Sequence, residues 1–312
     1  MSMYPNQDSA DYGERAAFIM ASTGETVTYA DFNARANRLA HLLRSSGLQH
    51  QDHYAIMMEN NDRYMEACAA GERAGLYYTC VNSYLTADEL AYILINSESQ
   101  ILITSIAKLD VVRDAVTQCP AVRQVLVVDA AEMDLPEGFD DYASACGGFP
   151  GEPIADELLG TSMLYSSGTT GRPKGIIRPL PAQPPAEQLP IFDFLGDLWR
   201  YRDRMIYLSP APLYHSAPQA AVNLTIRHGG TVIIMERFDP QEYLALIERY
   251  QVSHSQLVPT MFSRMLKLPE AQRLAYDLSS LEIAIHAAAP CPVMVKEQMI
   301  DWWGPIIHEY YG

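Results

Sequence analysis

One stretch of the sequence reads, from residue 165 to residue 175, Tyr165-Ser166-Ser167-Gly168-Thr169-Thr170-Gly171-Arg172-Pro173-Lys174-Gly175. Its three glycines let the backbone turn tightly and point N–H groups at an anion, and its four Ser and Thr hydroxyls add further donors. Lys174 supplies a point charge for phosphate, and Arg172 could supply a second. The stretch therefore predicts a phosphate-binding loop.

The spacing of this loop differs from that of a P-loop NTPase, which requires Gly-x4-Gly-Lys-Ser/Thr. Here the gap from Gly168 to Gly171 is too short, and Gly175 stands where the metal-binding hydroxyl would be. A kinase glycine-rich loop fits no better. A flexible surface loop is the plain alternative for a run of Gly, Ser and Thr, but the full string with its lysine favours phosphate binding.

Helix and strand patterns alternate on both sides of the loop, which predicts an α/β fold with mainly parallel sheets covered by helices. Thr86 and Glu89 form a capping box at one helix start, and Gly47 and Gly75 stand at helix ends. The predicted helices cover residues 31–46, 62–74, 86–96, 109–118, 191–200, 240–250, 260–268 and 292–302, and the predicted strands cover residues 54–58, 101–104, 124–128, 161–165, 205–208, 231–235, 255–258 and 282–285.

Two segments interrupt this alternation. Residues 135–156 are rich in Gly, Pro and acidic residues and predict a connecting loop, and residues 178–190 hold five prolines, which exclude a regular helix or a central strand. We expect approximate subdomains at 1–156 and 157–312. A strand-like run, residues 306–311, is followed directly by the end of the sequence, so we expect an N-terminal fragment of a longer protein.

The bulk composition sets limits on the partners. A formal charge of −16 argues against a nucleic-acid backbone or an anionic membrane surface as the main partner. The five cysteines are scattered without a CxxC pair, as in a reducing compartment, and the polar start of the chain is unlike a signal peptide. We expect a cytoplasmic protein without stable membrane insertion, and a homodimer stays open.

Ser166 to Gly175 resembles the signature of the AMP-forming acyl-adenylating superfamily, which includes acyl-CoA synthetases, peptide-synthetase adenylation domains and luciferases. The resemblance covers almost the whole chain. One departure is Gln51-Asp52, where relatives have Gly-Asp before the first core strand; this turn is remote from the expected chemistry. Further segments that resemble family landmarks are Thr28-Tyr29, Pro212-Leu213-Tyr214-His215-Ser216, Val258-Pro259-Thr260, Ala287-Ala288-Ala289-Pro290 and Glu309-Tyr310-Tyr311-Gly312.

The resemblance implies stacked, mainly parallel β-sheets flanked by helices, as in the large N-terminal domain of these enzymes. It also implies that ATP, with Mg²⁺, activates a carboxylic acid to an acyl-adenylate, which most members pass to a thiol such as that of CoA. The residues expected to hold the β and γ phosphates are Ser166, Ser167, Gly168, Thr169, Thr170, Gly171 and Lys174. A leaving pyrophosphate needs such preorganised donors.

Other roles follow from the same resemblance. His215 resembles a gate beside the acyl carboxylate, where a neutral imidazole could donate to a carboxylate oxygen. Residues expected around the adenine are Ala287, Ala288, Ala289, Pro290, Tyr310, Tyr311 and Gly312, with Tyr311 stacking on the base. Acyl-pocket residues are expected in 214–219, in 261–264 and around His286. His228, His254 and His308 have no comparable context and are expected to be structural.

In relatives, the threonine and glutamate for phosphate and Mg²⁺, the ribose aspartate and the catalytic lysine all follow the position of Gly312. We therefore expect these residues alone to bind nucleotide weakly at best and not to complete the reaction. Details around Asn60, residues 75–78, residues 286–290 and residues 302–305 resemble bacterial fatty-acyl or steroid-acid CoA ligases and favour a hydrophobic acid. The alternatives are an adenylation domain for an amino acid or aryl acid, and a non-catalytic nucleotide-binding module.

Overall fold

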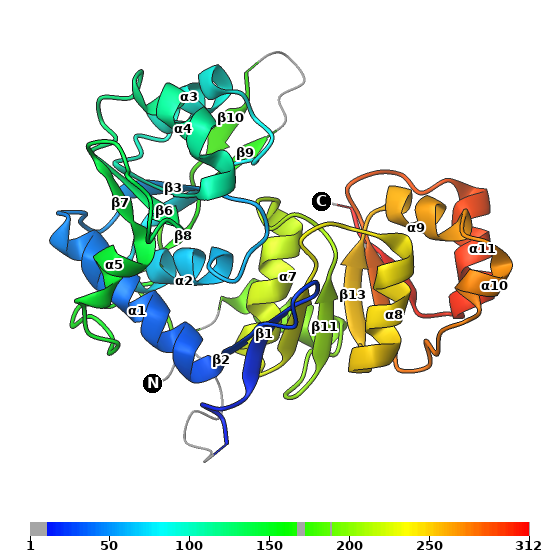
Figure 1. The fold of residues 1–312 in the computed structure, drawn as a ribbon. Helices are drawn as coiled ribbons and strands as arrows, with labels where there is room; N and C mark the ends of the chain where they lie inside the picture. Colours follow the sequence, from blue (N-terminus) through cyan, green and yellow to red (C-terminus); the bar gives the residue numbers. More distant parts are fainter. Residues whose placement is uncertain (1–10, 167–171, 188, 312) are drawn as a thin grey trace. The chain divides into compact units, whose positions relative to one another are not determined.

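The computed structural model describes residues 11–166, 172–187 and 189–311 (Figure 1). The chain divides into two compact units. The first contains Tyr29–Gln188 and Leu213–Ser216, and the second contains Ser2–Thr28, Leu189–Pro212 and Ala217–Gly312. The approximate division expected near residue 156 falls inside the first unit.

The first unit is built on a six-stranded sheet in the order β7-β6-β5-β3-β4-β8, in which every neighbouring pair is parallel. Its strands are β3 (His53–Met57), β4 (Tyr77–Cys80), β5 (Ile101–Ser105), β6 (Gln124–Val128), β7 (Phe139–Asp141) and β8 (Thr161–Ser162). Its helices are α1 (Tyr29–Ser45), α2 (Tyr64–Ala74), α3 (Ala87–Asn96), α4 (Leu109–Val116) and α5 (Tyr142–Gly147), with a short 3₁₀ turn at Ile106–Lys108. All five residues of β5 are buried, as expected for a parallel strand covered on both faces.

Local signals in the sequence set several helix ends in this unit. Gly75 has φ 63° and ends α2 in the left-handed conformation that glycine adopts without strain. Thr86 accepts a hydrogen bond from the backbone of Glu89, while the Glu89 side chain accepts one from the backbone of Thr86, so the predicted capping box starts α3.

A two-stranded antiparallel hairpin, β9 (Leu164–Ser166) and β10 (Lys174–Ile176), carries the flanks of the glycine-rich stretch. The single strand predicted at 161–165 is therefore wrong, because the chain leaves the large sheet after Ser162 and pairs with β10 instead. The segment 135–156 was also predicted incorrectly as a loop, because it holds β7 and α5. Asp141 caps α5 by accepting a 2.8 Å hydrogen bond from the backbone of Ser144.

The second unit is built on a seven-stranded sheet in the order β15-β14-β13-β11-β12-β1-β2, parallel except for the antiparallel β1–β2 pair. Its strands are β1 (Ala16–Met20), β2 (Thr26–Thr28), β11 (Ile206–Ser209), β12 (Thr231–Ile234), β13 (His254–Leu257), β14 (Ile283–His286) and β15 (Ile307–Glu309). Its helices are α6 (Pro190–Leu198), α7 (Ser216–Arg227), α8 (Pro240–Tyr250), α9 (Pro259–Leu266), α10 (Glu270–Arg273) and α11 (Val293–Trp303).

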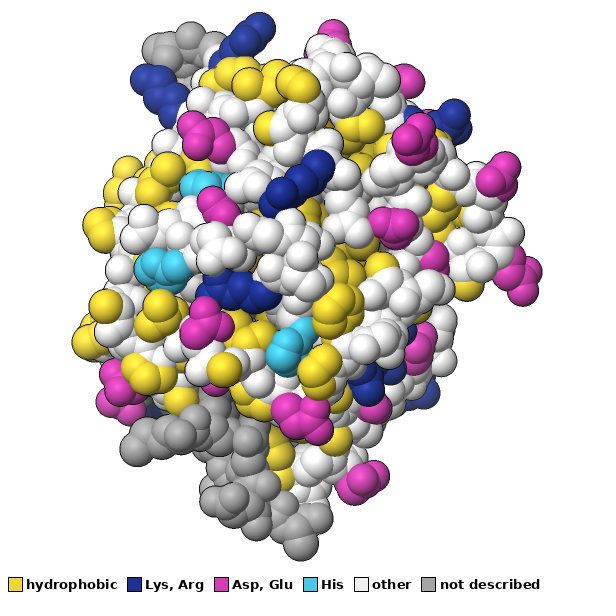
Figure 2. Space-filling model, turned by 90° about the vertical axis from the view of Figure 1, so that its left-hand side faces the viewer, with side chains coloured by type: hydrophobic (Ala, Val, Ile, Leu, Met, Phe, Trp, Pro, Cys, Tyr) yellow, Lys and Arg dark blue, Asp and Glu magenta, His cyan; other side chains and the backbone are white. Residues whose placement is uncertain are grey.

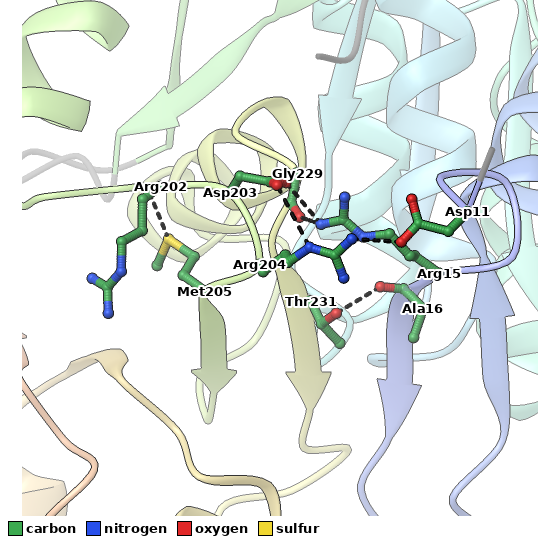
Figure 3. Close-up of polar contacts among 9 residues, drawn as sticks. All are labelled: Asp11, Arg15, Ala16, Arg202, Asp203, Arg204, Met205, Gly229 and Thr231. Atoms are coloured by element: carbon green, nitrogen blue, oxygen red, sulfur yellow. Dashed lines mark hydrogen bonds and ion pairs between the residues drawn. The ribbon is translucent and has the colours of Figure 1, made fainter. Parts of the chain in front are cut away.

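The N-terminal strand β1, which the sequence patterns did not predict, is fixed by polar contacts to β12 and to the segments that precede β11 and β12 (Figure 3). Arg15 forms a 2.8 Å ion pair with Asp203 and also donates to the carbonyl oxygen of Gly229. Thr231 donates a 2.7 Å hydrogen bond to the carbonyl oxygen of Ala16. Gly229 has φ 79°, and a Cβ there would collide with Asp203, so this corner requires glycine.

The parallel α/β architecture predicted from the sequence is thus confirmed. The described cysteines are free, and Cys68, Cys119 and Cys146 are buried. Of the helices in the described part of the chain, none combines the length and the hydropathy that a bilayer crossing requires.

Candidate functional site

Hairpin β9–β10 places the ends of the predicted phosphate-binding stretch opposite each other. Ser166, the last residue of β9, pairs with Lys174, the first residue of β10. The Lys174 and Arg172 side chains are both exposed, so their charges face solvent. The remaining residues proposed for phosphate contact, Ser167, Gly168, Thr169, Thr170 and Gly171, lie outside the described residues.

Gly175 has a packing reason to be glycine. A Cβ at this position would collide with the end of Met163 and would lie 3.2 Å from the ring of Tyr165. Tyr165 is its register partner on β9, so the two strands approach closely at the base of the hairpin. The glycine keeps Lys174 on a strand that can pair directly with β9.

Helix α3 contacts both flanks of the glycine-rich stretch. The Tyr92 hydroxyl donates a 2.9 Å hydrogen bond to the carbonyl oxygen of Pro173, and the Tyr165 hydroxyl donates a 2.7 Å hydrogen bond to Asn96 Oδ1. The Arg172 guanidinium lies 4.9 Å from the centroid of the Tyr92 ring. Burial raises the pKa of Tyr165 to about 12, so its hydroxyl keeps its proton.

Sequence reasoning missed Tyr92 and Asn96. The one available signal is their spacing of four residues, which places both side chains on one face of the predicted helix. Their hydrogen-bond partners, Pro173 and Tyr165, lie 81 and 69 residues further along the chain. No local pattern carries that information.

The segment that contains His215 is held by Asn60. Asn60 is buried, and its Oδ1 accepts a 2.8 Å hydrogen bond from the backbone N–H of Leu213. The ring centroids of Tyr214 and His215 lie 4.4 Å apart. Partial desolvation lowers the pKa of His215, so its imidazole is neutral near pH 7 although the side chain reaches solvent. His215 and Lys174 both belong to the first unit.

In the second unit, the structure brings together the two segments predicted to contact adenine. They follow β14 and β15, which are adjacent and parallel, with His286 and Glu309 in register. Ala287 is buried, whereas Ala288, Ala289 and Pro290 are exposed, and Ala288 has φ 73°. Ligands of open α/β sheets bind at such carboxyl ends of strands, and a non-glycine residue at positive φ stores strain that is typical of functional loops.

The two tyrosines at the end of β15 differ in environment. Gln256 donates a 2.8 Å hydrogen bond to the Tyr310 hydroxyl, and the Tyr310 ring centroid lies 5.5 Å from that of Trp199. Tyr311 is fully exposed, at 104% of its reference accessibility. Gly312 lies outside the described residues. Tyr311 therefore has a free aromatic face, while Tyr310 is committed to packing.

His286 sits at the base of this pair of segments. Its side chain is buried, neither ring nitrogen has a hydrogen-bond partner among the described residues, and Nε2 lies 4.0 Å from the Glu309 carboxylate. Glu309 forms an ion pair with Lys296 of α11. Burial lowers the pKa of His286 and the Lys296 charge lowers it further. Phe262, from the predicted acyl-pocket segment 261–264, meets the His286 ring edge-on at 5.5 Å and is itself a core residue.

Two of the histidines expected to be structural have backbone partners. His254 is buried, with Nε2 2.9 Å from the carbonyl oxygen of Trp199 and Nδ1 2.8 Å from the Ser253 hydroxyl. His228 Nδ1 lies 2.9 Å from the carbonyl oxygen of Leu224. Within the described ranges, no group of three or more His, Cys, Asp and Glu side chains could hold a metal ion. Figure 2 shows a face on which basic and acidic side chains are interspersed among apolar ones.

Comparison with known proteins places these features in context. The model of the family described as "AMP-binding enzyme" matches residues 6–312. A long-chain-fatty-acid–CoA ligase, FadD13, of Mycobacterium tuberculosis is 30% identical over 286 residues, covering 88% of this chain and 52% of the ligase. 4-Coumarate–CoA ligase 1 of Petroselinum crispum is 27% identical over 289 residues, covering 92% of this chain and 52% of the ligase. The chain thus spans about half the length of the curated relatives it matches.

Solved structures agree with the sequence comparison. The crystal structure of ATP-bound MatB from Rhodopseudomonas palustris superposes with a TM-score of 0.78 at 26% identity, covering 98% of this chain and 58% of MatB. Nearly the whole of this chain therefore corresponds to a little more than half of MatB.

Proposed function

The chain belongs to the AMP-binding enzyme family, and from that premise we propose that it is the nucleotide-binding part of an ATP-dependent acid–thiol ligase for a hydrophobic carboxylic acid. The observation that carries the proposal is hairpin β9–β10, which sets Ser166 opposite Lys174 at the two ends of the glycine-rich stretch. An exposed lysine beside consecutive small residues is suited to a polyphosphate.

In the proposed reaction, a carboxylate oxygen of the acid attacks the α-phosphorus of ATP, and the bond from this phosphorus to the bridging oxygen breaks. Pyrophosphate leaves with the bonding electron pair, and the product is an acyl-adenylate. The thiolate of CoA then attacks the acyl carbon, and AMP leaves. The role of Lys174 is to stabilise charge on the departing pyrophosphate, since fixed positive charge is most effective where negative charge develops.

His215 is proposed to act beside the acyl carboxylate. Its lowered pKa keeps the imidazole neutral, so one ring nitrogen can donate a hydrogen bond without forming a tight ion pair that would hold the carboxylate back. Asn60 supports this role, because it fixes the backbone two residues before His215.

Adenine is proposed to lie on residues 287–290 and Tyr311. The alanine side chains let a flat base approach the backbone, and Tyr311 offers an unoccupied ring face. Mg²⁺ is proposed to enter bound to the phosphates of ATP, which is its usual mode of binding in nucleotide sites. CoA is proposed as the thiol acceptor, as in the ligases to which the chain is similar.

The substrate acid has two candidates. The similarity to a fatty-acid ligase favours an aliphatic acid, and the similarity to a 4-coumarate ligase favours an aryl acid. The two relatives differ by only three percentage points in identity, 30% against 27%. We propose the aliphatic acid first, because Asn60, residues 75–78 and residues 302–305 resemble fatty-acyl and steroid-acid ligases.

The test is a panel of carboxylic acids given to the complete natural polypeptide that carries this sequence, with AMP release measured with and without CoA. A CoA-dependent thioester from aliphatic acids supports the proposal, and from coumarate or ferulate it supports the aryl alternative. Amino-acid-dependent pyrophosphate exchange without a CoA thioester would overturn both. The variant Lys174→Ala should lose AMP release on every acid, whereas Lys267→Ala, which removes an exposed lysine elsewhere, should not.

A further inference from the structure

We propose that α3 is the positioning element of the phosphate-binding stretch, with Tyr92 and Asn96 as its positioning residues. That the ligand is a polyphosphate rests on the proposed function, whereas the role of α3 in holding the hairpin rests on the contacts themselves. Tyr92 binds the C-terminal flank through the Pro173 carbonyl oxygen at 2.9 Å, and Asn96 binds the N-terminal flank through the Tyr165 hydroxyl at 2.7 Å.

The hairpin needs such a support. Strands β9 and β10 have three residues each, and within the described residues their only strand pairing is with one another. An isolated two-stranded hairpin is marginally stable in water, so these strands cannot fix the position of Lys174 by themselves. The contacts to α3 attach the middle of β9, at Tyr165, and the residue before β10, Pro173, to separate side chains on a common helix face.

Helix α3 is rigid enough to serve as this support. The Thr86–Glu89 capping box fixes its first turn, and Leu90, Ala91, Ile93 and Leu94 are buried in the core cluster of the first unit. Tyr92 and Tyr165 pack against the same cluster with their rings. The two hydroxyls therefore project from rings whose positions are set by the core.

Tyr92 also contacts the charged side chain of Arg172. The Arg172 guanidinium lies over its ring at 4.9 Å, next to the Pro173 carbonyl that the hydroxyl binds. One tyrosine thus fixes both the backbone and the cation that precede Lys174. Asn96, four residues further along the helix, fixes the other strand. Helix α3 carries none of the side chains of the phosphate-binding motif. It affects phosphate binding by fixing the hairpin that carries Lys174.

The sequence supplies a specific reporter for the hairpin. Between Arg123 and Arg200 the only Lys and Arg residues are Arg172, Lys174 and Arg178. Proline follows Arg172 and Arg178, which blocks trypsin, so Lys174–Gly175 is the one tryptic bond in this interval. That bond lies within β10, and cleavage requires the strand to leave β9. Its cleavage rate therefore measures local opening of the hairpin.

The experiment compares tryptic cleavage at Lys174–Gly175 in the chain and in the variants Tyr92→Phe, Tyr165→Phe and Asn96→Ala. Each single variant should raise the rate about three- to fivefold, the effect of losing one neutral hydrogen bond. Tyr92→Leu, which also removes the ring beneath Arg172, should be cleaved faster than Tyr92→Phe. The control is Ile95→Ala, an exposed position on the same helix, and it should match the parent chain.

Two measurements distinguish local opening of the hairpin from a general loss of stability. Cleavage after Arg123 should have the same rate in Tyr92→Phe and in the parent chain, and the thermal unfolding midpoint should fall by no more than the loss of one hydrogen bond explains. Equal Lys174–Gly175 cleavage rates in all variants, or acceleration at every tryptic site together, would overturn the positioning role. If one variant folds poorly, Tyr165→Phe tests the same support from the opposite strand.

Magnesium pyrophosphate tests the ligand part of the inference. It should slow Lys174–Gly175 cleavage in the parent chain, and half-protection should need about fivefold more pyrophosphate in Tyr92→Phe. Equal half-protection concentrations would overturn the link between α3 and phosphate binding. Absence of any protection in the parent chain would count against the proposed function, while the difference in basal cleavage would still decide whether α3 holds the hairpin.

Discussion

Gln256 Nε2 donates a 2.8 Å hydrogen bond to the hydroxyl of Tyr310. This contact, together with the Trp199 ring, holds the residue that immediately precedes Tyr311. Tyr311 itself is fully exposed. The structure thus separates two adjacent tyrosines into a packed residue and a residue with a free ring.

The first prediction follows from this difference. Tyr311→Ala should weaken ATP binding about tenfold, since stacking of a base on an aromatic ring contributes about 1–3 kcal/mol, and it should leave the unfolding midpoint unchanged. Tyr310→Phe is the matched control: it should lower the free energy of unfolding by about 1 kcal/mol and leave ATP affinity unchanged. Titration calorimetry and thermal denaturation measure the two effects. The reverse pattern would contradict the assignment of Tyr311 to adenine.

The second prediction concerns Glu66, a fully buried carboxyl group on α2. Burial raises its pKa to about 7, and the nearby Arg63 opposes this shift only in part. The pKa of Glu66 is thus higher in the folded chain than the value of 4.5 for an unperturbed glutamate. Between pH 4.5 and 7, the folded chain keeps a proton on Glu66 that the unfolded chain has lost. The contribution of Glu66 to the free energy of unfolding should therefore fall as pH rises from about 4.5 to 7, by on the order of 3 kcal/mol.

Glu66→Gln tests this directly, because the amide keeps an acceptor oxygen toward Arg63 but does not ionise. The variant should be more stable than the parent chain at pH 8 and should show a flatter dependence between pH 5 and 8 in urea denaturation. Glu297→Gln, at an exposed position of α11, provides the control. Parallel curves for Glu66→Gln and the parent chain would rule out a titrating Glu66.

The third prediction concerns acid. Burial lowers the pKa of His254 to about 4, while its two ring nitrogens are engaged by Trp199 and Ser253. In the unfolded chain this histidine takes up a proton near pH 6.5, whereas in the folded chain it does so only near pH 4. The contribution of His254 to the free energy of unfolding should therefore be lost as pH falls from about 6.5 to 4. The expected loss is about 3 kcal/mol.

His254→Gln should remove most of this acid sensitivity while keeping a donor toward the Trp199 carbonyl oxygen. Unfolding midpoints between pH 4 and 7 measure the effect, and His308→Gln makes the same change at an exposed position. An unchanged acid limb in His254→Gln would show that other groups govern acid unfolding.

The fourth prediction compares two arginines that Figure 3 shows near one another. Arg15 is mostly buried, with 13% of its side chain accessible, and binds both Asp203 and the Gly229 carbonyl. Arg204 is 62% accessible and pairs with Asp11 and Asp203. Arg15→Ala should lower the free energy of unfolding by about 2 kcal/mol, because it leaves a carbonyl without its charged donor. Arg204→Ala should leave the unfolding midpoint unchanged, as expected for an exposed ion pair. A larger loss of stability in Arg204→Ala than in Arg15→Ala would contradict the prediction.

These cases show which parts of the fold a sequence reveals. Helix α3 was predicted because its cap and its apolar periodicity lie within ten residues. Helix α7 was missed because it is buried on almost every side and has a proline in its first turn, so it lacks the polar–apolar contrast that marks a surface helix. Strands β1 and β4 were missed because residues that pair with them lie far away in the sequence, Val232 opposite Phe18 and Thr161 opposite Tyr77.

The candidate site divides in the same way. Lys174 and the residues that flank it were found from their chemistry and spacing, which are local. Tyr92, Asn96 and Asn60 act on backbone or side-chain groups 69 to 153 residues away, so only the folded chain relates them to the motifs they hold. Tyr310 and Tyr311 look alike in the sequence, and only the contacts of Gln256 and Trp199 distinguish them.

The fifth prediction concerns Lys174 itself. If its ammonium group binds the β and γ phosphates, Lys174→Ala should weaken binding of magnesium pyrophosphate about tenfold, and the effect should shrink as ionic strength rises, because the group is exposed and its field is screened. Lys174→Arg should retain part of the affinity, since the charge is kept but its geometry changes. Lys267→Ala removes an equal charge from an exposed position outside the hairpin and should bind like the parent chain. Phosphorus-31 line broadening gives the affinities, and a loss at Lys267 equal to that at Lys174 would mean that pyrophosphate senses only the net charge of the protein.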